Sequence, residues 1–324
     1  MPLPNDEKVV ALANELVQQF DAMFGLHPGF RPAHAKGMVL TGAFTPTEGA
    51  AGISRAPHFQ RPTTPVTVRF SNSTGIPTIP DNDASANPRG LAIRFHLGDR
   101  VHTDIVSHSV DAFPTKTGQE FLEFLRAAAS SIGANGPDTP IAKFLATHPG
   151  ALAFVQMPKP TPASFATEAY FGVTAMRFID QTGTGRYGRY RIEPDAGVET
   201  LTDAESAKRS ADFLFEELTH RIGQGTVKFR LMAQLAEDGD VVDDATVHWP
   251  ETRRVLELGK ISLTAPVTAD AEEQRHIIFD PIPRVDGIDP SADPLLELRA
   301  AVYLISGRRR RGAEAAKGGN VGTV

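Results

Sequence analysis

The sequence predicts an α+β fold in which helices are inserted into, and flank, an antiparallel β-sheet or barrel. Three observations carry this prediction. Segments rich in β-branched and aromatic residues fill the middle of the chain in two sets. Helical patterns stand at both ends and between these sets. Strands and helices do not alternate one for one, which argues against the βαβ units of a parallel sheet.

The first element is a helix over residues 6–24. Gly25 follows it and marks its end. Apolar side chains recur at helical spacing on one face, namely Val9, Leu12, Ala13, Leu16, Val17 and Phe20.

Four strands follow, separated by Gly, Pro and Asn clusters: Met38–Phe44, Val66–Ser71, Leu91–Leu97 and Val101–Val106. A capping box, in which Thr117 and Glu120 satisfy each other's backbone N–H groups, predicts that a helix begins there. Residues 130–165 are rich in Pro and predict loops with one short helix around 141–155.

The second set of strands comprises Val173–Ile179, Tyr187–Ile192, Val227–Leu235 and Leu256–Thr264. Within this set, a second capping box at Thr202 and Glu205 predicts a helix that runs to Gly223.

A C-terminal helix completes the fold. Asp293 is a suitable N-cap, Pro294 suits the first turn, and Gly307 predicts the helix end. Arg299 and Tyr303 are four residues apart, so a guanidinium lies one turn from a phenol oxygen. A neighbouring cation favours the phenolate form of a tyrosine, and a phenolate can ligate haem iron. An ordinary surface pair would have the same spacing.

Composition indicates a globular protein that binds neither nucleic acid nor membrane. The chain has 324 residues, 41% of them hydrophobic and 22% charged, which is usual for globular domains. Its net charge of −6 argues against the broad basic surface that nucleic-acid binding needs. No apolar run reaches the length of a membrane span. The absence of cysteine excludes disulfides, cysteine nucleophiles, iron–sulfur clusters and thiolate-ligated haem.

A single domain is predicted for residues 1–311, because neither a linker nor an internal repeat interrupts the chain. Residues 312–324 are predicted to be a flexible tail. The segment Met1–Lys8 has no basic region followed by a long apolar stretch, so no secretory signal is visible. We therefore expect a cytoplasmic protein; a periplasmic one would need a leader that had been trimmed away.

Three motifs occur in order around the first strands. They are Phe30-Arg31-Pro-Ala-His34-Ala-Lys-Gly37, Val68-Arg69-Phe-Ser71-Asn-Ser-Thr-Gly75 and Asn87-Pro-Arg89-Gly90-Leu-Ala-Ile-Arg-Phe95. Together they resemble the distal half of the haem-dependent catalase superfamily, whose fold is an antiparallel β-barrel with helices enclosing haem.

The rest of the chain extends this resemblance. Arg299-x-x-x-Tyr303 is similar to the proximal tyrosine motif of the same superfamily. Three further segments resemble the stretch that leads to it: His248-Trp249-Pro250, Leu258-Gly-Lys260-Ile-Ser-Leu263 and Phe279-Asp280-Pro281. The resemblance runs from about residue 20 to 311 and therefore covers nearly the whole predicted domain.

The resemblance implies roles for the two faces of a haem site. Tyr303 would ligate the iron, and Arg299 would maintain its phenolate. His34 would move a proton between the two oxygens of a peroxide, since a neutral imidazole can act as base and then as acid. Ser71 resembles the residue that hydrogen-bonds the outer side of that imidazole and fixes its tautomer.

Three arginines, Arg31, Arg69 and Arg310, match positions that face the haem propionates, and guanidinium groups suit carboxylates. Phe113 is expected to pack near the porphyrin, although it could be an ordinary core residue. The run Arg308–Arg311 could also be a solvated basic tail or a nucleic-acid patch.

The chain differs from full-length catalases in two ways. It ends soon after the tyrosine helix, as the compact catalase-related peroxidases do. Ser109 is matched to the position where catalases present a distal Asn, which predicts weak dismutation of hydrogen peroxide. Asp293 and Arg191 match positions of a network beneath the tyrosine, although catalases have His in place of Arg191.

The function that the resemblance implies is a peroxidase dependent on haem b. It would reduce hydrogen peroxide or organic hydroperoxides through a ferryl intermediate with a small organic electron donor, and catalase activity would be weak. A homo-oligomer is an open option. The alternatives are an enzyme that rearranges fatty-acid hydroperoxides and a haem-binding protein without turnover. A passive carrier would have no need of His34 and Ser71.

A further alternative uses His102, Asp104 and His108, which share one face of a predicted strand and could form a metal triad. No His-Glu-x-x-His signature accompanies them. Serine-hydrolase chemistry is unsupported as well, because no Gly-x-Ser-x-Gly elbow occurs. The haem interpretation is therefore the prediction of the sequence.

Overall fold

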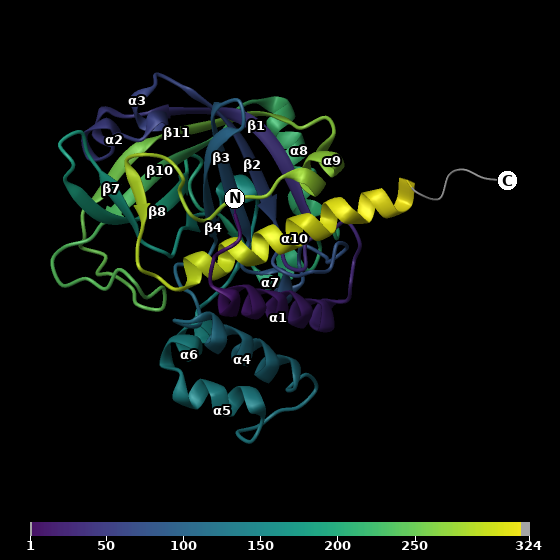
Figure 1. Cartoon of the computed structure of the whole chain (residues 1–324). Coiled ribbons are helices and arrows are strands. Elements are labelled where there is room, and N and C mark those ends of the chain that lie inside the picture. The colour runs from purple at the N-terminus through teal and green to yellow at the C-terminus, as the bar shows by residue number, and fades with distance from the viewer. Residues whose placement is uncertain (1, 319–324) are drawn as a thin grey trace.

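The computed structural model describes residues 2–318, with side chains to residue 313. Its centre is a ring of eight antiparallel strands (Figure 1). The last strand of the ring pairs with the first, so the barrel is closed. In ring order the strands are β10 (Val227–Leu235), β11 (Val255–Pro266), β1 (Gly37–Pro46), β2 (Thr64–Ser71), β3 (Gly90–Gly98), β4 (Val101–His108), β6 (Tyr170–Phe171) and β8 (Gly185–Pro194). The predicted α+β barrel is confirmed.

Aromatic side chains fill the core of the barrel. The rings of Phe44 and Phe95 meet edge to face with their centroids 5.2 Å apart, and those of Phe70 and Phe229 lie 5.9 Å apart. All four side chains are at most 1% exposed. A barrel of eight strands is narrow enough for its own side chains to fill, so the barrel is a solid scaffold and the functional cavity lies at its outer wall.

Short strands extend this sheet outside the ring. β7 (Met176–Ile179) pairs with β8, and β12 (Ile288–Pro290) pairs with β7. The strand predicted over Val173–Ile179 is therefore confirmed only from Met176 onward. β5 (Thr161–Pro162) and β9 (Thr200–Leu201) form a separate pair.

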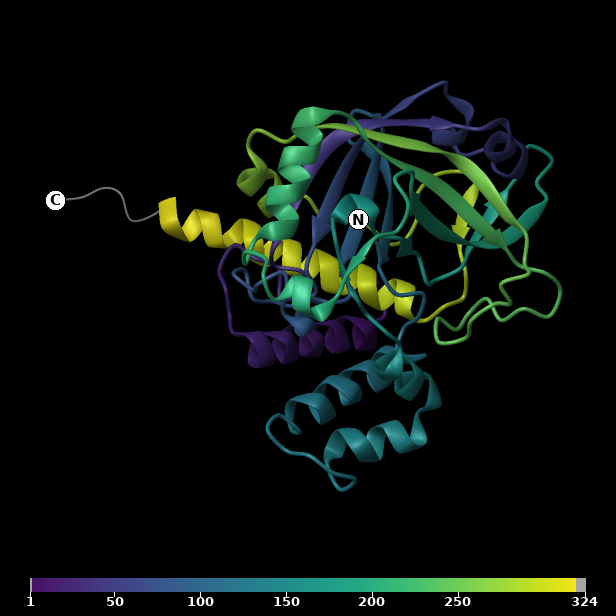
Figure 2. The same cartoon turned by 180° about the vertical axis from the view of Figure 1, so that it is seen from behind.

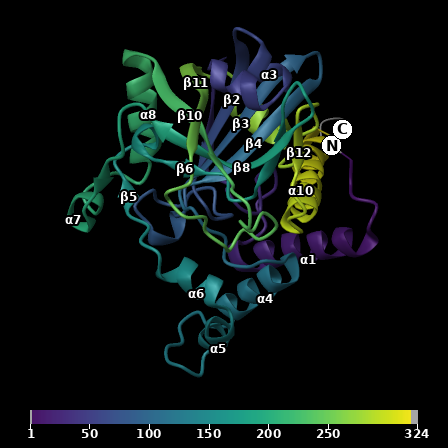
Figure 3. The same cartoon turned by 90° about the vertical axis from the view of Figure 1, so that its left-hand side faces the viewer.

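Three helices pack together beside the barrel: α1 (Glu7–Phe24), α4 (Gly118–Ala129) and α10 (Leu295–Gly318). Their shared apolar cluster includes Leu16, Leu122, Leu298 and Ala301. The capping box of Thr117 and Glu120 begins α4 as predicted. Two further helices, α5 (Pro140–Thr147) and α6 (Pro149–Gln156), project with α4 away from the barrel (Figure 3).

The remaining helices cover other parts of the barrel. α8 (Phe213–Gln224) lies against β11 on the far side (Figure 2). The others are α2 (Glu48–Ile53), α3 (Pro57–Gln60), α7 (Asp203–Ser206), α9 (Asp270–His276) and two 3₁₀ turns, η1 (Ala84–Ala86) and η2 (Phe165–Thr167). Among the described residues, no helix combines the length and apolarity of a membrane span.

Two predicted helices are each divided in the structure. The helix expected from Thr202 to Gly223 is α7 followed by α8, with residues 207–212 between them. The helix expected around 141–155 is α5 followed by α6, and they meet at His148. Pro149 begins α6, because proline disfavours helical geometry in the residue before it.

The predicted end of the last helix is wrong. α10 passes through Gly307 and continues to Gly318. A Cβ atom at Gly307 would overlap the side chain of Ile278, so glycine is needed there for close packing. The tail predicted from residue 312 is likewise helical over 312–318, where the sequence contains the strong helix formers Ala and Glu. Residues 319–324 of that tail lie outside the described residues.

Candidate functional site

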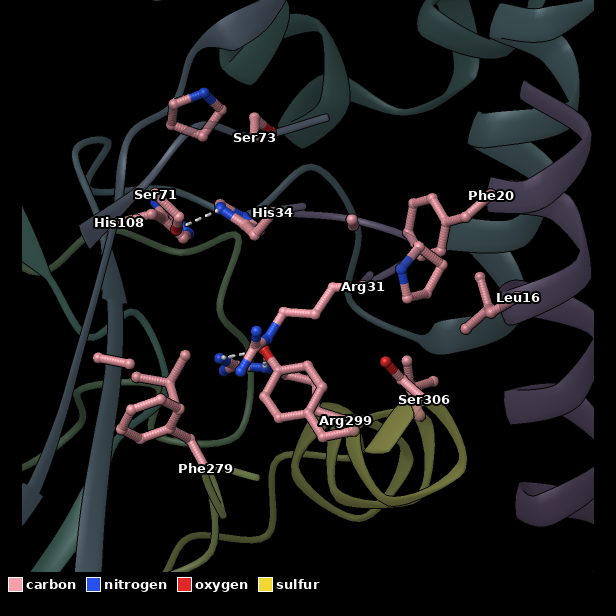
Figure 4. A pocket seen from close by; sticks show the side chains of 18 of the residues that line it. Leu16, Phe20, Arg31, His34, Ser71, Ser73, His108, Phe279, Arg299 and Ser306 are labelled. Carbon is pink, nitrogen blue, oxygen red and sulfur yellow. Dashed lines mark hydrogen bonds between the residues drawn. The ribbon is translucent and has the colours of Figure 1, made fainter. Parts of the chain in front are cut away.

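A cavity of about 400 Å³ lies between the barrel wall and α10. In Figure 4, His34 and Ser71 approach it from the barrel side, and Arg299 approaches from α10. Side chains of α1, including Leu16 and Phe20, form a further wall. The lining contains every predicted site residue except Ser109, namely Arg31, His34, Arg69, Ser71, Phe113, Arg299, Tyr303 and Arg310.

The His34 side chain is held by its backbone and by one hydroxyl group. Its φ angle is 56°, a left-handed conformation that is uncommon for residues other than glycine. The His34 N–H donates to the Ser73 carbonyl at 2.8 Å, and Arg69 Nη2 donates to the His34 carbonyl at 2.9 Å. Its imidazole Nδ1 is hydrogen-bonded to Ser71 Oγ at 3.1 Å. Burial, with the Arg69 cation adding to it, lowers the pKa of His34 to about 3, so this imidazole is neutral.

The absence of a side chain at Gly90 leaves room for the His34 imidazole. It pairs with Ser71 on one side and with His108 on the other, in neighbouring strands. A Cβ atom on Gly90 would lie 2.6 Å from Ser71 Oγ and 2.8 Å from His34 Nδ1. Ser71, Gly90 and His108 therefore lie side by side on β2, β3 and β4. The His34 imidazole packs against Gly90, in the middle of this row.

The opposite face of the cavity is formed by the predicted Arg299–Tyr303 pair. Arg299 donates to the Tyr303 phenol oxygen from Nε at 3.4 Å and from Nη2 at 3.3 Å. Asp293 begins α10 as predicted, because its Oδ1 accepts a hydrogen bond from Leu295 N at 2.9 Å. Arg191 is bonded elsewhere, to Asp111 and Gln234, and neither Asp293 nor Arg191 lines the cavity.

The three predicted arginines form a cationic edge, in which Arg31 is half-buried. Arg69 is 4% exposed and Arg310 is 3% exposed. Their hydrogen bonds, like those of Arg31, go to neutral partners such as the Gln274 side chain and the Ile277 carbonyl. Burial lowers the pKa of Arg69 to about 9 and that of Arg310 to about 8. Within the described chain no carboxylate is paired with these cations, so the edge is suited to an anionic ligand.

These features fit a haem. Tyr303 would ligate its iron, because a phenolate is an established haem ligand. Arg31, Arg69 and Arg310 would hold its two carboxylates, which would supply the negative charge that the cationic edge lacks. The apolar side chains of the lining, among them Val106, Leu298 and Phe279, suit a porphyrin ring.

Ser109, the residue matched to the distal Asn of catalases, does not line the cavity. Its Oγ accepts a hydrogen bond from Arg89 N at 2.9 Å, and its own N–H donates to the Arg89 carbonyl at 2.8 Å. The neighbouring residue His108 lines the cavity instead. Neighbours on an extended segment point in opposite directions, so an error of one position exchanges an inner side chain for an outer one.

The alternative metal triad of His102, Asp104 and His108 is also wrong. The Asp104 carboxylate forms a two-point ion pair with Arg94, at 2.9 and 2.7 Å. His108 faces the cavity, and no group of three or more residues of metal-ligating type gathers anywhere in the described part of the chain. Sequence reasoning considered His108 as a metal ligand and otherwise expected it at the strand end beside the haem pocket, without a role there. It missed Gly90 because one sequence gives no sign of what a glycine faces.

Comparison with known proteins identifies the family. The family model described as Catalase matches residues 28–317. The chain belongs to the catalase family. A catalase-related peroxidase of Mycolicibacterium paratuberculosis is 35% identical over 295 residues, which cover 90% of this chain and 92% of the relative. A catalase-related peroxidase of Synechococcus elongatus is 33% identical, with 92% and 89% covered. The predicted family resemblance is confirmed.

Solved catalases share this fold. A fungal catalase matches with a TM-score of 0.77 at 22% identity, and catalase A from Saccharomyces cerevisiae with 0.75 at 22%. The match covers 96% of this chain but 64% of the fungal chain. Catalase-2 of Bacillus subtilis is 28% identical, and 42% of its length is covered. This catalase-family chain is thus similar in length to its catalase-related peroxidase relatives and shorter than these catalases.

Proposed function

We propose that this protein is a peroxidase that holds haem b and reduces a peroxide with electrons from a small organic donor. Membership of the haem-dependent catalase family makes it an oxidoreductase that acts on peroxide. One observation carries the finer assignment: the His34–Ser71 pair and the Arg299–Tyr303 pair face one cavity whose edge holds unpaired arginine cations.

When bound, haem supplies an iron that takes up the oxidising equivalents of the peroxide and passes them to the donor. The residues of the chain prepare this chemistry. Tyr303 would hold the iron, and the two hydrogen bonds from Arg299 would stabilise negative charge on its oxygen. Arg31, Arg69 and Arg310 would orient the porphyrin by its carboxylates.

His34 moves the proton on the other face. When its Nδ1–H donates to Ser71 Oγ, the lone pair of Nε2 is free to accept a proton from one peroxide oxygen and return it to the other. Because burial keeps the pKa of His34 near 3, the imidazole is in the basic form throughout the neutral pH range. The left-handed backbone at His34 fixes the position of the ring.

The expectation of weak dismutation loses its original basis, because Ser109 lies outside the cavity. The residue beside His34 is a second imidazole, that of His108, in place of the primary amide that the catalase pattern expects.

Product analysis with hemin-reconstituted protein tests the proposed function. We expect oxidation of a phenolic donor such as guaiacol that depends on both hydrogen peroxide and hemin. We expect His34→Asn, which tolerates a left-handed backbone, to keep hemin and to react with peroxide about 10²–10⁴-fold more slowly. Consumption of a fatty-acid hydroperoxide without any donor would show rearrangement instead. Hemin binding with no reaction toward peroxide would show a carrier.

A further inference from the structure

We propose that Gln274 is a positioning residue, which holds Arg69 in the orientation that presents its Nη1 to a carboxylate of the haem. This inference rests on the proposed function, since it assigns a residue that prepares the same site. Gln274 lies on α9, outside the lining of the cavity. It would therefore act on the ligand only through Arg69.

Gln274 contacts two of the three arginines of the cationic edge. Its side-chain Oε1 accepts a hydrogen bond from Arg69 Nε at 2.9 Å. Its backbone carbonyl accepts a hydrogen bond from Arg31 Nη1 at 3.0 Å. Both arginines are more than 200 residues away along the chain. This one residue of α9 thus links a distant part of the chain to the edge where the haem carboxylates would bind.

The amide of Gln274 satisfies its partners in one orientation only. Its Nε2 donates to the Gly37 carbonyl at 2.8 Å and to Asp270 Oδ2 at 2.6 Å. A carbonyl and an ionised carboxylate can only accept hydrogen bonds, whereas the guanidinium of Arg69 can only donate them. The amide oxygen must therefore face Arg69. Asp270 is fixed in turn, because its Oδ1 accepts a hydrogen bond from Val39 N at 2.7 Å.

Arg69 needs this contact to keep its guanidinium plane in place. Its Nη2 donates to the His34 carbonyl at 2.9 Å and to the Ala35 carbonyl at 3.3 Å. Both bonds are made by one nitrogen, and a planar group held at one atom can turn about that atom. The bond from Nε to Gln274 supplies a second point and so fixes the plane.

The fixed plane leaves one nitrogen of Arg69 for a ligand. Nη1 has no hydrogen-bond partner among the described residues, and it keeps some accessible surface. Arg69 is buried and lines the cavity. Buried polar groups in native structures are usually satisfied, and a carboxylate is the acceptor that a guanidinium binds best. Nη1 is therefore the donor that would bind a haem carboxylate.

A neutral amide at this position also preserves the charge of Arg69. Burial lowers the pKa of Arg69 to about 9, the Arg310 cation adds to this effect, and Asp270 opposes it. Gln274 is hydrogen-bonded to both Asp270 and Arg69. The carboxylate is thus held by the amide rather than paired directly with the guanidinium, whose positive charge remains for the ligand.

The test is a double-mutant cycle on hemin binding, with Gln274→Met, Arg69→Met and the variant that carries both changes. Methionine keeps an unbranched side chain but cannot donate these hydrogen bonds. Glu272→Met is the matched control, because Glu272 is exposed on the same helix. Quenching of Trp249 fluorescence gives the dissociation constant of hemin, and circular dichroism checks that each apoprotein is folded.

We expect Gln274→Met to raise the dissociation constant of hemin about tenfold, which is the effect of one hydrogen bond. Glu272→Met should leave it unchanged. When Arg69 is already methionine, Gln274→Met should have almost no further effect, because it acts through Arg69. Losses that add in the double variant would overturn the proposal, and so would parent affinity in Gln274→Met.

A second measurement needs no hemin. In the ¹⁵N–¹H spectrum of the apoprotein, the Arg69 Nε–H signal is identified by its absence in Arg69→Met. We expect this proton to exchange with water about tenfold faster in Gln274→Met than in the parent or in Glu272→Met, because its acceptor is gone. Equal exchange would contradict the proposal. If the parent does not bind hemin, the proposed function fails, and this exchange rate still decides whether Gln274 holds Arg69.

Discussion

Gly90 and His34 are in such close contact that a Cβ atom on Gly90 would lie 2.8 Å from the imidazole Nδ1. The same atom would lie 2.6 Å from Ser71 Oγ. One methyl group would therefore separate the proposed proton carrier from its hydrogen-bonding partner. The position of His34 on this face of the cavity therefore depends on the absence of a side chain at Gly90.

Gly90→Ala should displace the His34 imidazole without touching the Tyr303 face. We expect hemin content to stay at the parent level and the peroxide reaction to slow by about 10–100-fold, since small misplacements of a catalytic group have effects of that size. Stopped-flow absorbance measures it. Gly98→Ala is the control, because among the described residues a Cβ there would meet Val101 alone, at 3.9 Å. Equal rates for the two variants would show that the fit at Gly90 is unimportant.

Tyr303→Phe should remove the proposed iron ligand and preserve the packing of the ring on α10. We expect the apoprotein to fold as the parent does, by circular dichroism, and to lose tight hemin retention on a desalting column. The visible spectrum of any hemin that remains should change, because its ligand would be different. An unchanged spectrum with full hemin content would mean that another residue ligates the iron.

Arg310→Gln should weaken hemin binding, since it removes one buried cation from the arginine edge. A hydrogen bond to a charged group contributes about 1.5–3 kcal/mol, so we expect the dissociation constant of hemin to rise about 10- to 150-fold. Fluorescence quenching of Trp249 can follow the titration. Arg311→Gln is the matched control, because Arg311 is exposed and, among the described residues, donates to the His276 carbonyl. An identical change in both variants would contradict a specific role for Arg310.

Buried His58 should make the apoprotein sensitive to acid. Burial lowers the pKa of His58 to about 3 in the folded chain, against about 6.5 when unfolded. Between these values the unfolded chain binds more protons, so stability rises with pH through this window and falls as pH falls below 6.5. At pH 5 the loss from one such histidine is about 2 kcal/mol.

His58→Phe should flatten this dependence, since phenylalanine suits a site between the rings of Phe44, Phe59 and Phe95 and does not titrate. Urea unfolding at pH 7.5 and pH 5 measures the difference, with exposed His220→Gln as the control. The same slope in His58→Phe and the parent would show that His58 is not the group responsible.

The parts of the fold that depend on local chemistry could be predicted from the sequence. The capping boxes at Thr117 and Thr202 begin helices as expected, because the reciprocal hydrogen bonds are made within four residues. The strands of the barrel were predictable from their β-branched and aromatic runs. The two-residue strand β6 was not, since Tyr170–Phe171 becomes a strand only through its partners on β4 and β8.

The predictions that failed depend on distant contacts. Gly307 looked like a helix end, but it is glycine because Ile278 packs against it. Most of the predicted site residues line one cavity, and they could be named because they belong to motifs of a known family. The choice between Ser109 and His108 depended on which side chain turns inward where β4 ends, and one sequence does not contain that information.

The two faces of the cavity come from opposite ends of the chain, His34 near the start and Tyr303 near the end. Contacts between such distant segments impose a large loop-closure entropy, and they are slow to form. A ligand that needs both faces binds only the completed fold and stabilises it by mass action. If the cofactor binds as proposed, a nascent chain that lacks α10 or has docked it wrongly would not retain the cofactor, so cofactor content would report on whether the fold is complete.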